Sequence, residues 1–292
     1  MVMHFWKLFI LVLLTMIAFA ANSVLTRLAI SNNQLGPASF SFFRLISGSI
    51  VLIIIVFIRS GLLCIWESKP NMASILGLSF YMVGFHFAYN SLDAGLGAIV
   101  LFGGVQLVMF TSTILSKEKT SFYNWAGMLL AMLGILILFF PKDLVIADQV
   151  YGLLLMLLAS LGWGIYSLSG RRSKDPIAST MSNFIFTIPT VSLVLLFYPD
   201  SISLSHNGVL LAICSGAIMS ALGYSLWYAI LPFLEKPVAS LVQLVVPVIA
   251  LILGIIILDE KLTYLSFFSS LLIIGGISFG IFSDGFKKRF KE

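Results

Sequence analysis

Small groups of polar and aromatic side chains recur at helical spacing within apolar segments of this sequence. His86, Tyr89 and Asn90 share one helical face, as do Tyr224 and Trp227, because residues three and four apart are neighbours on a helix. Such side chains can hydrogen-bond to a small molecule and stack on it, and polar faces of apolar helices tend to line a bundle interior or a water-filled cavity. The candidate cavity residues are Asn22, His86, Tyr89, Asn90, Gln106, Trp163, Tyr166, Asn183, Tyr224, Trp227 and Gln243.

These candidates also have structural interpretations. Tyr89 could belong to an aromatic belt at a membrane surface, and the threonines between residues 177 and 197 could hydrogen-bond to their own backbone. Gln106 and Gln243 could either hold helices together or contact a substrate. His86 could be a satisfied structural histidine, a ligand contact or a proton-exchange site.

Two arginines lie within apolar segments or at their ends. Arg27 closes the first segment, and Arg44 lies about two helical turns into the second. Either guanidinium could bind an anion. Alternatively, Arg44 could cap backbone carbonyls or pair with Asp93 or Asp259 in a structural role.

Motifs for bond-making chemistry are missing from the sequence. It has no HExxH motif, no phosphate-binding loop, no GxSxG motif and no cluster of acids within an apolar segment, so we expect no catalytic residue, no metal site and no cofactor. Cys64 and Cys214 lack zinc-ligand spacing and imply no disulfide framework.

The composition is that of a membrane protein. Of the 292 residues, 60% are hydrophobic and 10% are charged, and the mean hydropathy is +1.08, whereas soluble domains carry about 25% charged residues. The net charge of +5 does not indicate a nucleic-acid partner, because the basic residues lie in short connectors between apolar segments.

Ten apolar segments have approximately the length needed to cross a bilayer, which is roughly 17–25 residues. They are Phe5–Ile30, Ala38–Ile58, Met72–Leu92, Leu96–Leu115, Trp125–Phe140, Tyr151–Ser169, Ile177–Phe197, Val209–Ile230, Val238–Leu258 and Leu265–Phe282. Alternatively, the first segment could be a signal peptide, since Ala18-Phe19-Ala20 resembles a cleavage site.

The basic residues predict the orientation of the ten segments. With the N-terminus in the cytoplasm, 13 of the 17 Lys and Arg residues fall on the cytoplasmic side, as the positive-inside rule requires. We therefore expect a multi-pass protein of the inner membrane with both termini in the cytoplasm.

The second half of the sequence echoes the first. An offset of 142 residues aligns Ser116-Lys117-Glu118-Lys119 with Leu258-Asp259-Glu260-Lys261 and Gly134 with Gly276. Residues 1–142 and 143–292 thus each hold five segments, and an odd number forces the second half to enter the membrane inverted. A cleaved first segment would leave the first half incomplete. Inverted repeats place a substrate site at their interface near the midplane.

These features resemble the drug/metabolite transporter superfamily, and specifically EamA-type proteins. The residues that carry the resemblance are Trp163-Gly164 with Arg171, the weaker counterpart from Phe19-Ala20 to Arg27, Phe43-Arg44, Glu118-Lys119, Glu260-Lys261 and Pro247. Two departures are Phe19-Ala20, where the family often has Trp-Gly, and Gly104-Val105, where a proline is common. The resemblance implies an all-α membrane protein with ten transmembrane helices, two EamA repeats and a central cavity.

The resemblance also implies the function, which the residues alone do not give. We expect an exporter or exchanger of amino acids or similar small metabolites that works by alternating access. The alternatives are uptake or exchange of a nucleotide-derived metabolite and, from another class, an integral-membrane enzyme or lipid-modifying protein. The expected partners are the substrate and the bilayer, with a homodimer left open. Because no carboxylate lies at mid-depth, we expect facilitated diffusion or exchange, and a proton cycle through His86 is the alternative.

Overall fold

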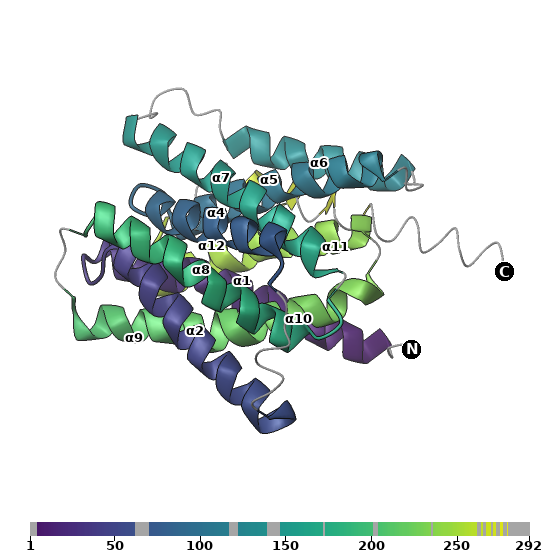
Figure 1. The fold of residues 1–292 in the computed structure, drawn as a ribbon. Helices are drawn as coiled ribbons and strands as arrows, with labels where there is room; N and C mark the ends of the chain where they lie inside the picture. Colours follow the sequence, from purple (N-terminus) through teal and green to yellow (C-terminus); the bar gives the residue numbers. More distant parts are fainter. Residues whose placement is uncertain are drawn as a thin grey trace.

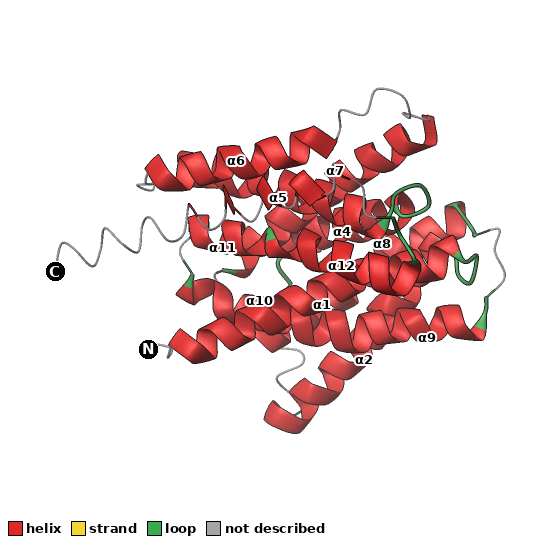
Figure 2. Cartoon of the chain, turned by 180° about the vertical axis from the view of Figure 1, so that it is seen from behind, coloured by secondary structure: helices red, strands yellow, loops and turns green. Residues whose placement is uncertain are grey.

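The computed structural model describes residues 5–61, 70–116, 122–138, 147–171, 173–200, 204–234 and 236–261, and short pieces between residues 264 and 279. Every regular element in these ranges is a helix (Figure 1), and short loops connect many of the helices (Figure 2). The helices are α1 (Phe5–Ser31), α2 (Pro37–Ser60), α4 (Met72–Ala88), α5 (Ala94–Leu115), α6 (Phe122–Leu138), α7 (Ala147–Gly170), α8 (Pro176–Phe197), α9 (His206–Cys214), η1 (Ser215–Ser220), α10 (Ala221–Ile230), η2 (Leu231–Phe233), α11 (Lys236–Gln243) and α12 (Val245–Leu258).

The first nine predicted segments correspond to helices in the described ranges. Seven of these helices are long and apolar enough to cross a membrane, and α4 is a shorter apolar helix. The eighth segment comprises α9, the π-helical η1 and α10, and the ninth is divided into α11 and α12 at Leu244. The third segment ends earlier than predicted, at Ala88. The tenth lies largely outside the described residues.

The burial pattern differs from that in a water-soluble protein. Large apolar side chains such as Ile58, Leu196 and Ile256 are at least 70% exposed on the bundle surface, where lipid is the appropriate solvent. Polar side chains, including those of Arg44 and Gln243, are fully buried. Polar groups turned inward from an apolar exterior are typical of a membrane bundle.

Polar residues fix where several helices begin. Asn71, Asp175 and Ser205 each accept a hydrogen bond from a backbone N–H in the first turn of α4, α8 and α9, respectively. The start of α2 is capped from elsewhere in the chain, because the Asp200 carboxylate accepts hydrogen bonds from the backbone N–H groups of Ala38 and Ser39. Such caps satisfy N–H groups that have no partner within the helix.

The first helix belongs to the bundle. It packs against α5, α9, α10 and α12, and both Phe19 and Ala20 of the cleavage-like triplet are buried in its middle. This placement agrees with the repeat, which requires the first segment as the counterpart of α7.

The helix contacts follow the internal repeat. In the repeat, α4 corresponds to α10, α7 to α1 and α5 to α12. Helix α4 packs on α7, and α10 packs on α1 in the same way. Helix α5 packs on α7, and α12 packs on α1. Helices α2 and α8, which are counterparts, pack directly together, as do α5 and α12. Exchanging the two halves therefore maps these contacts onto one another, as expected for a pseudo-twofold axis.

The helix ends show that the halves run in opposite directions. At one end of the bundle, which we call the Arg27 end, the Ser205 backbone N–H before α9 donates to the Gln34 carbonyl after α1. At the other end, which we call the Arg59 end, Arg59 of α2 forms an ion pair with Asp175 at the start of α8. Helix α2 thus ends where α8 begins, and the two counterparts are antiparallel.

Candidate functional site

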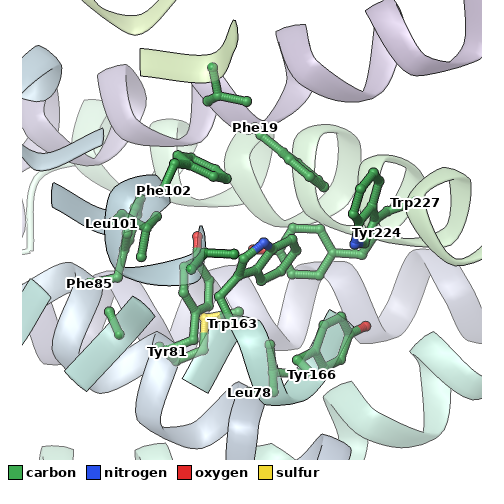
Figure 3. Packing of buried hydrophobic residues seen from close by; sticks show 14 of the residues in the cluster. Phe19, Leu78, Tyr81, Phe85, Leu101, Phe102, Trp163, Tyr166, Tyr224 and Trp227 are labelled. Atoms are coloured by element: carbon green, nitrogen blue, oxygen red, sulfur yellow. The ribbon is translucent and has the colours of Figure 1, made fainter. Parts of the chain in front are cut away.

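An aromatic cluster fills the centre of the bundle at the interface between the two repeats (Figure 3). Trp163 of α7 lies in its middle, with ring centroids 4.7 Å from Tyr224 of α10, 5.0 Å from Phe19 of α1 and 5.1 Å from Tyr81 of α4. Trp227 packs on the other side of Phe19, at 5.9 Å. Both repeats therefore contribute rings that a small molecule with apolar groups could stack on.

The sequence predicted a water-filled cavity here, but the residues expected to line it are buried in this structure. We expected contact with water at His86, Gln106, Trp163, Tyr224 and Gln243, but each of these residues is at most 2% exposed. The prediction is wrong for this conformation because the aromatic side chains occupy the space between the repeats.

Several candidate residues hydrogen-bond to one another across the cluster. The Trp163 indole N–H donates to Gln243 Oε1 at 2.7 Å, and the Gln243 amide N–H donates to the Ala239 carbonyl at 3.1 Å. The Trp227 indole N–H donates to Ser167 Oγ at 3.1 Å. Buried polar groups are thereby satisfied without water.

Two further candidates, Tyr166 and Asn183, lie nearer the Arg59 end and contact Tyr228. Tyr228 donates to the Tyr166 backbone carbonyl at 3.1 Å and accepts a 3.4 Å hydrogen bond from the Asn183 amide. On the same helix as Asn183, the hydroxyls of Thr180 and Thr187 donate to backbone carbonyls four residues earlier. The structural interpretation of these two threonines is confirmed.

The predicted face of His86, Tyr89 and Asn90 is not continuous. Because α4 ends at Ala88, Tyr89 is buried at the helix end with its ring against Gly97, whereas Asn90 is exposed in the following turn. Asn90 therefore does not belong to the site. Gln106 is buried on α5.

Arg44 of α2 is the centre of a buried polar network. Its Nε donates to Ser220 Oγ at 2.8 Å, and its Nη2 donates to the Tyr224 hydroxyl at 2.6 Å and, more weakly, to Tyr81 at 3.4 Å. Its Nη1 lies 3.0 Å from Nε2 of His86. Arg44 is fully buried, and its partners come from both repeats.

The expected pairing of Arg44 with Asp93 or Asp259 is wrong. Asp93 instead pairs with Arg27, with 3.2 Å between Oδ1 and Nη2, and Asp259 is exposed after the end of α12. A helical side chain leans toward the N-terminal end of its helix, and Arg44 reaches the histidine and hydroxyl groups at its own depth.

Arg44 determines the protonation of His86. A guanidinium can only donate hydrogen bonds, so Nε2 of His86 must accept, and the ring proton is on Nδ1. Nδ1 lies 2.5 Å from the Met82 carbonyl and 2.7 Å from Ser41 Oγ. This arrangement holds His86 neutral, which favours its structural interpretation over a proton-exchange role.

A π-helical turn brings α9–α10 against this network. Within η1, the Ser215 hydroxyl donates to Asn22 Oδ1 at 2.7 Å. The Ser220 hydroxyl donates to the Ser215 carbonyl at 2.7 Å and lies 3.3 Å from the same Asn22 oxygen. Gly216 allows the close approach of α2, because a Cβ there would lie 2.1 Å from the Arg44 carbonyl oxygen. π-Helical turns occur frequently at functional sites.

Tyr81 and the serines of η1 were not among the residues that the sequence indicated. Tyr81, Phe85 and Tyr89 are spaced four residues apart, and this aromatic stripe on one face of the third segment could have indicated Tyr81. Ser220 carries no comparable signal, because its position depends on the π-helical turn.

Charged residues form contacts at the Arg27 end, and one of these contacts joins the two repeats. Besides its ion pair with Asp93, Arg27 donates to the Tyr89 carbonyl at 2.8 Å, so a structural contact, not an anion site, accounts for this arginine. Glu260 after α12 accepts a 2.8 Å hydrogen bond from the Ala94 N–H at the start of α5. Burial raises the pKa of Glu260, as does neighbouring Asp93, and the hydrogen bond from Ala94 partly opposes this shift.

Other contacts connect the helices at the Arg59 end. Besides the ion pair of Arg59 with Asp175, Arg171 at the end of α7 donates to the Leu234 carbonyl after α10. Beside these contacts, a groove of about 450 Å³ lies between α2, α8 and α10, with Ile55, Ile177, Leu222 and Leu226 among its lining residues.

The comparisons with known proteins agree with this architecture. The chain is 36% identical over 269 residues to an uncharacterized protein of Pseudomonas aeruginosa, covering 92% of both chains. It is 23% identical to a probable amino-acid metabolite efflux pump of Escherichia coli, covering 76% of this chain and 80% of that protein, and 26% identical to a protein of the same description in Salmonella typhimurium, covering 73% and 76%.

The fold is shared with a solved crystal structure at a TM-score of 0.71, with 18% sequence identity and coverage of 91% of this chain and 97% of the other. At this identity, the likeness shows the fold alone. The EamA-like transporter family matches residues 6–140 and again residues 150–282. With both repeats matched and an all-α membrane fold, this chain belongs to the EamA-like transporter family.

Proposed function

We propose that this protein is an exporter or exchanger of amino acids or similar small metabolites that works by alternating access. The observation that carries the proposal is the buried cluster around Arg44 and Trp163, to which both inverted repeats contribute. A cluster at the interface of inverted repeats is where a secondary transporter binds its substrate.

The closed centre is consistent with one state of such a cycle. Contacts join the repeats at both the Arg27 end and the Arg59 end, while the polar and aromatic side chains between them are buried. Alternating access would separate the repeats first at one end and then at the other, so that the cluster meets water on one side at a time.

The substrate class is supported by the names of two relatives, each a probable amino-acid metabolite efflux pump, and by the chemistry of the cluster. Aromatic rings suit apolar side chains, while hydroxyl, amide and guanidinium groups suit the polar part of an amino acid. A nucleotide-derived metabolite remains the alternative substrate.

Exchange in reconstituted vesicles tests the proposal. Each standard amino acid is tested in turn. For one or more of them, proteoliposomes loaded with the unlabelled amino acid should take up its radiolabelled form faster than protein-free liposomes do. Exchange of uridine monophosphate with no exchange of any amino acid would support the alternative substrate instead.

We expect transport to follow the substrate gradient without an imposed pH gradient, because Arg44 holds His86 neutral. His86→Gln should therefore leave the pH dependence of exchange unchanged, although its rate can fall because the contacts to Ser41 and Met82 are altered. The measurement is initial exchange rate against pH in the two proteins. Accumulation driven by a pH gradient and lost in His86→Gln would contradict this prediction.

We propose that the protein lies in the inner membrane with both termini in the cytoplasm. In this orientation the Arg27 end faces the periplasm. The charge bias of the connectors supports this orientation. Reporter fusions after Lys142 and after Lys288 should report opposite sides of the membrane. Finding both on one side would contradict the orientation.

A further inference from the structure

Among the described residues, Arg44 carries a buried charge that has no acidic counter-ion. Its guanidinium is fully buried, and in the described part of the chain arginine forms ion pairs with acidic residues at Arg27–Asp93 and Arg59–Asp175. The groups that contact Arg44, namely His86, Ser220, Tyr81 and Tyr224, are all neutral.

An arginine in this position is costly to keep, because burying a charge is unfavourable unless the charge is paired. Part of the cost is offset by hydrogen bonds and by aromatic rings, since the guanidinium carbon lies 5.4 Å from the Phe85 ring centroid and 5.6 Å from that of Tyr81. Cation–π contacts act within about 6 Å. None of these groups neutralises the charge.

The network also holds an unused hydrogen-bond donor. Within the described part of the chain, Nδ2 of Asn22 is buried and has no hydrogen-bond partner, while Oδ1 of the same amide accepts from Ser215 and lies 3.3 Å from the Ser220 hydroxyl. Ser220 in turn contacts Arg44. The orphan N–H of Asn22 needs a hydrogen-bond acceptor, and the charge of Arg44 needs an anion. An anionic acceptor would supply both.

We propose that Arg44 binds the carboxylate of the transported molecule, an inference that rests on the proposed transport function. The two Nη atoms of Arg44 present a fork that matches a carboxylate. The carboxylate would take the place of the Tyr81 hydroxyl, whose 3.4 Å contact is the longest that Arg44 makes. The apolar part of the molecule would then lie against the rings of Trp163 and Phe19.

The charge of the network favours a carboxylate over a phosphoryl group. The described residues around Arg44 provide one positive charge, because His86 is held neutral and the other partners cannot become cations. One guanidinium balances one carboxylate, whereas a phosphate monoester at neutral pH carries close to two negative charges. At Arg44, the carboxylate of a molecule such as an amino acid is therefore favoured over the phosphate of a nucleotide-derived metabolite.

Matched ligand pairs test the inference on the unmodified protein. The melting temperature of the purified protein is measured with each standard amino acid, with the carboxamide of the same amino acid, with uridine monophosphate and with inorganic phosphate. We expect stabilisation by one or more amino acids and little by their carboxamides, uridine monophosphate or phosphate. Equal stabilisation by an amino acid and its carboxamide would overturn the inference.

Variants of the two arginines of α2 provide the second arm. Arg44→Met should weaken amino-acid binding by about 100-fold, as expected when a buried charge loses its partner, and should remove the preference over the carboxamide. Arg59→Met is the matched control, because Arg59 pairs with Asp175 away from the network, and the preference should persist. A folded Arg44→Met protein that keeps the preference would contradict the inference.

The vesicle assay separates this inference from the proposed function. If amino acids exchange but their carboxamides exchange equally well, transport stands and the role of Arg44 is wrong. If no amino acid binds or exchanges, the proposed function fails and the carboxylate site fails with it. If Arg44→Met does not fold, the ligand pairs on the unmodified protein decide.

Discussion

Replacement of Gly162 by leucine is expected to prevent the protein from reaching its folded state. Helices α4 and α7 cross at Gly77 and Gly162, and a Cβ at Gly162 would lie 2.4 Å from the Gly77 carbonyl oxygen and 2.6 Å from the Tyr81 backbone nitrogen. Backbone atoms cannot rotate away as a side chain can. The helices would have to separate, and such close approach through small residues is a main source of helix association in a membrane.

Gly162→Ala should produce a smaller effect of the same sign. Overpacking commonly costs about 1–3 kcal/mol, so the alanine variant should fold with a lower melting temperature, while the leucine variant should yield no monodisperse peak in size-exclusion chromatography. Gly275→Leu is the control, because a Cβ at Gly275 would meet no described heavy atom within 4 Å. A Gly162→Leu protein as stable as the unmodified one would show that α4 and α7 do not cross this closely.

This crossing also positions the candidate site. A Cβ at Gly77 would lie 2.9 Å from the Tyr166 backbone nitrogen, just as one at Gly162 would crowd that of Tyr81. Both tyrosines belong to the aromatic cluster around Trp163. The rings from the two repeats can therefore meet at about 5 Å because the helices that carry them are held together by two glycines.

The positions of the helices could be predicted from the sequence because lipid imposes a simple rule. A helix must remain apolar across the bilayer, and charges and prolines accumulate at its ends. The prediction failed for Asn90, because it assumed that this helix continues to Leu92. The chain instead turns after Ala88, next to the short connection that contains Asp93.

The contacts of the site could be predicted only in part. Helical spacing indicated His86, Trp163, Tyr224 and Gln243 as residues that line a cavity, since each interrupts an apolar segment, but the structure buries all four. The spacing could not show that Arg44 meets His86 and Ser220, because such contacts depend on how α2, α4 and η1 pack. The π-helical turn over 215–220 has an ordinary helical composition, so no local sequence pattern predicts it.

Glu260→Ala is expected to open the Arg27 end of the protein. Asp93, the residue before α5, makes no side-chain cap and pairs with Arg27 instead, so Glu260 from the second repeat caps α5 through the Ala94 N–H. Hydrogen bonds to charged groups contribute about 1.5–3 kcal/mol, and partial exposure of Glu260 reduces this value. Because about 1.4 kcal/mol corresponds to a tenfold change in an equilibrium constant, we expect up to about a tenfold larger open population.

Cysteine accessibility measures this population. Ser23 is buried on α1, one turn before Arg27, and Ser23→Cys can be introduced after Cys64 and Cys214 are replaced by serine. A membrane-impermeant maleimide should label this cysteine faster in Glu260→Ala than in the parent protein. Lys261→Ala is the control, because Lys261 is the exposed neighbour and should leave the rate unchanged. Equal labelling in the Glu260→Ala and parent proteins would show that this contact does not hold the end closed.

The same carboxylate predicts how the opening depends on pH. In the closed state, burial and Asp93 raise the pKa of Glu260, against the opposing effects of the Ala94 N–H and Arg27, whereas in an open, hydrated state the pKa would return toward its ordinary value. The closed state therefore binds the proton more tightly, and falling pH favours closure across the window between the two pKa values. Since maleimide labelling itself slows in acid, the informative quantity is the labelling rate of Glu260→Ala divided by that of the parent. This ratio should rise as the external pH falls through the window, and a ratio independent of pH would mean that Glu260 titrates alike in the two states.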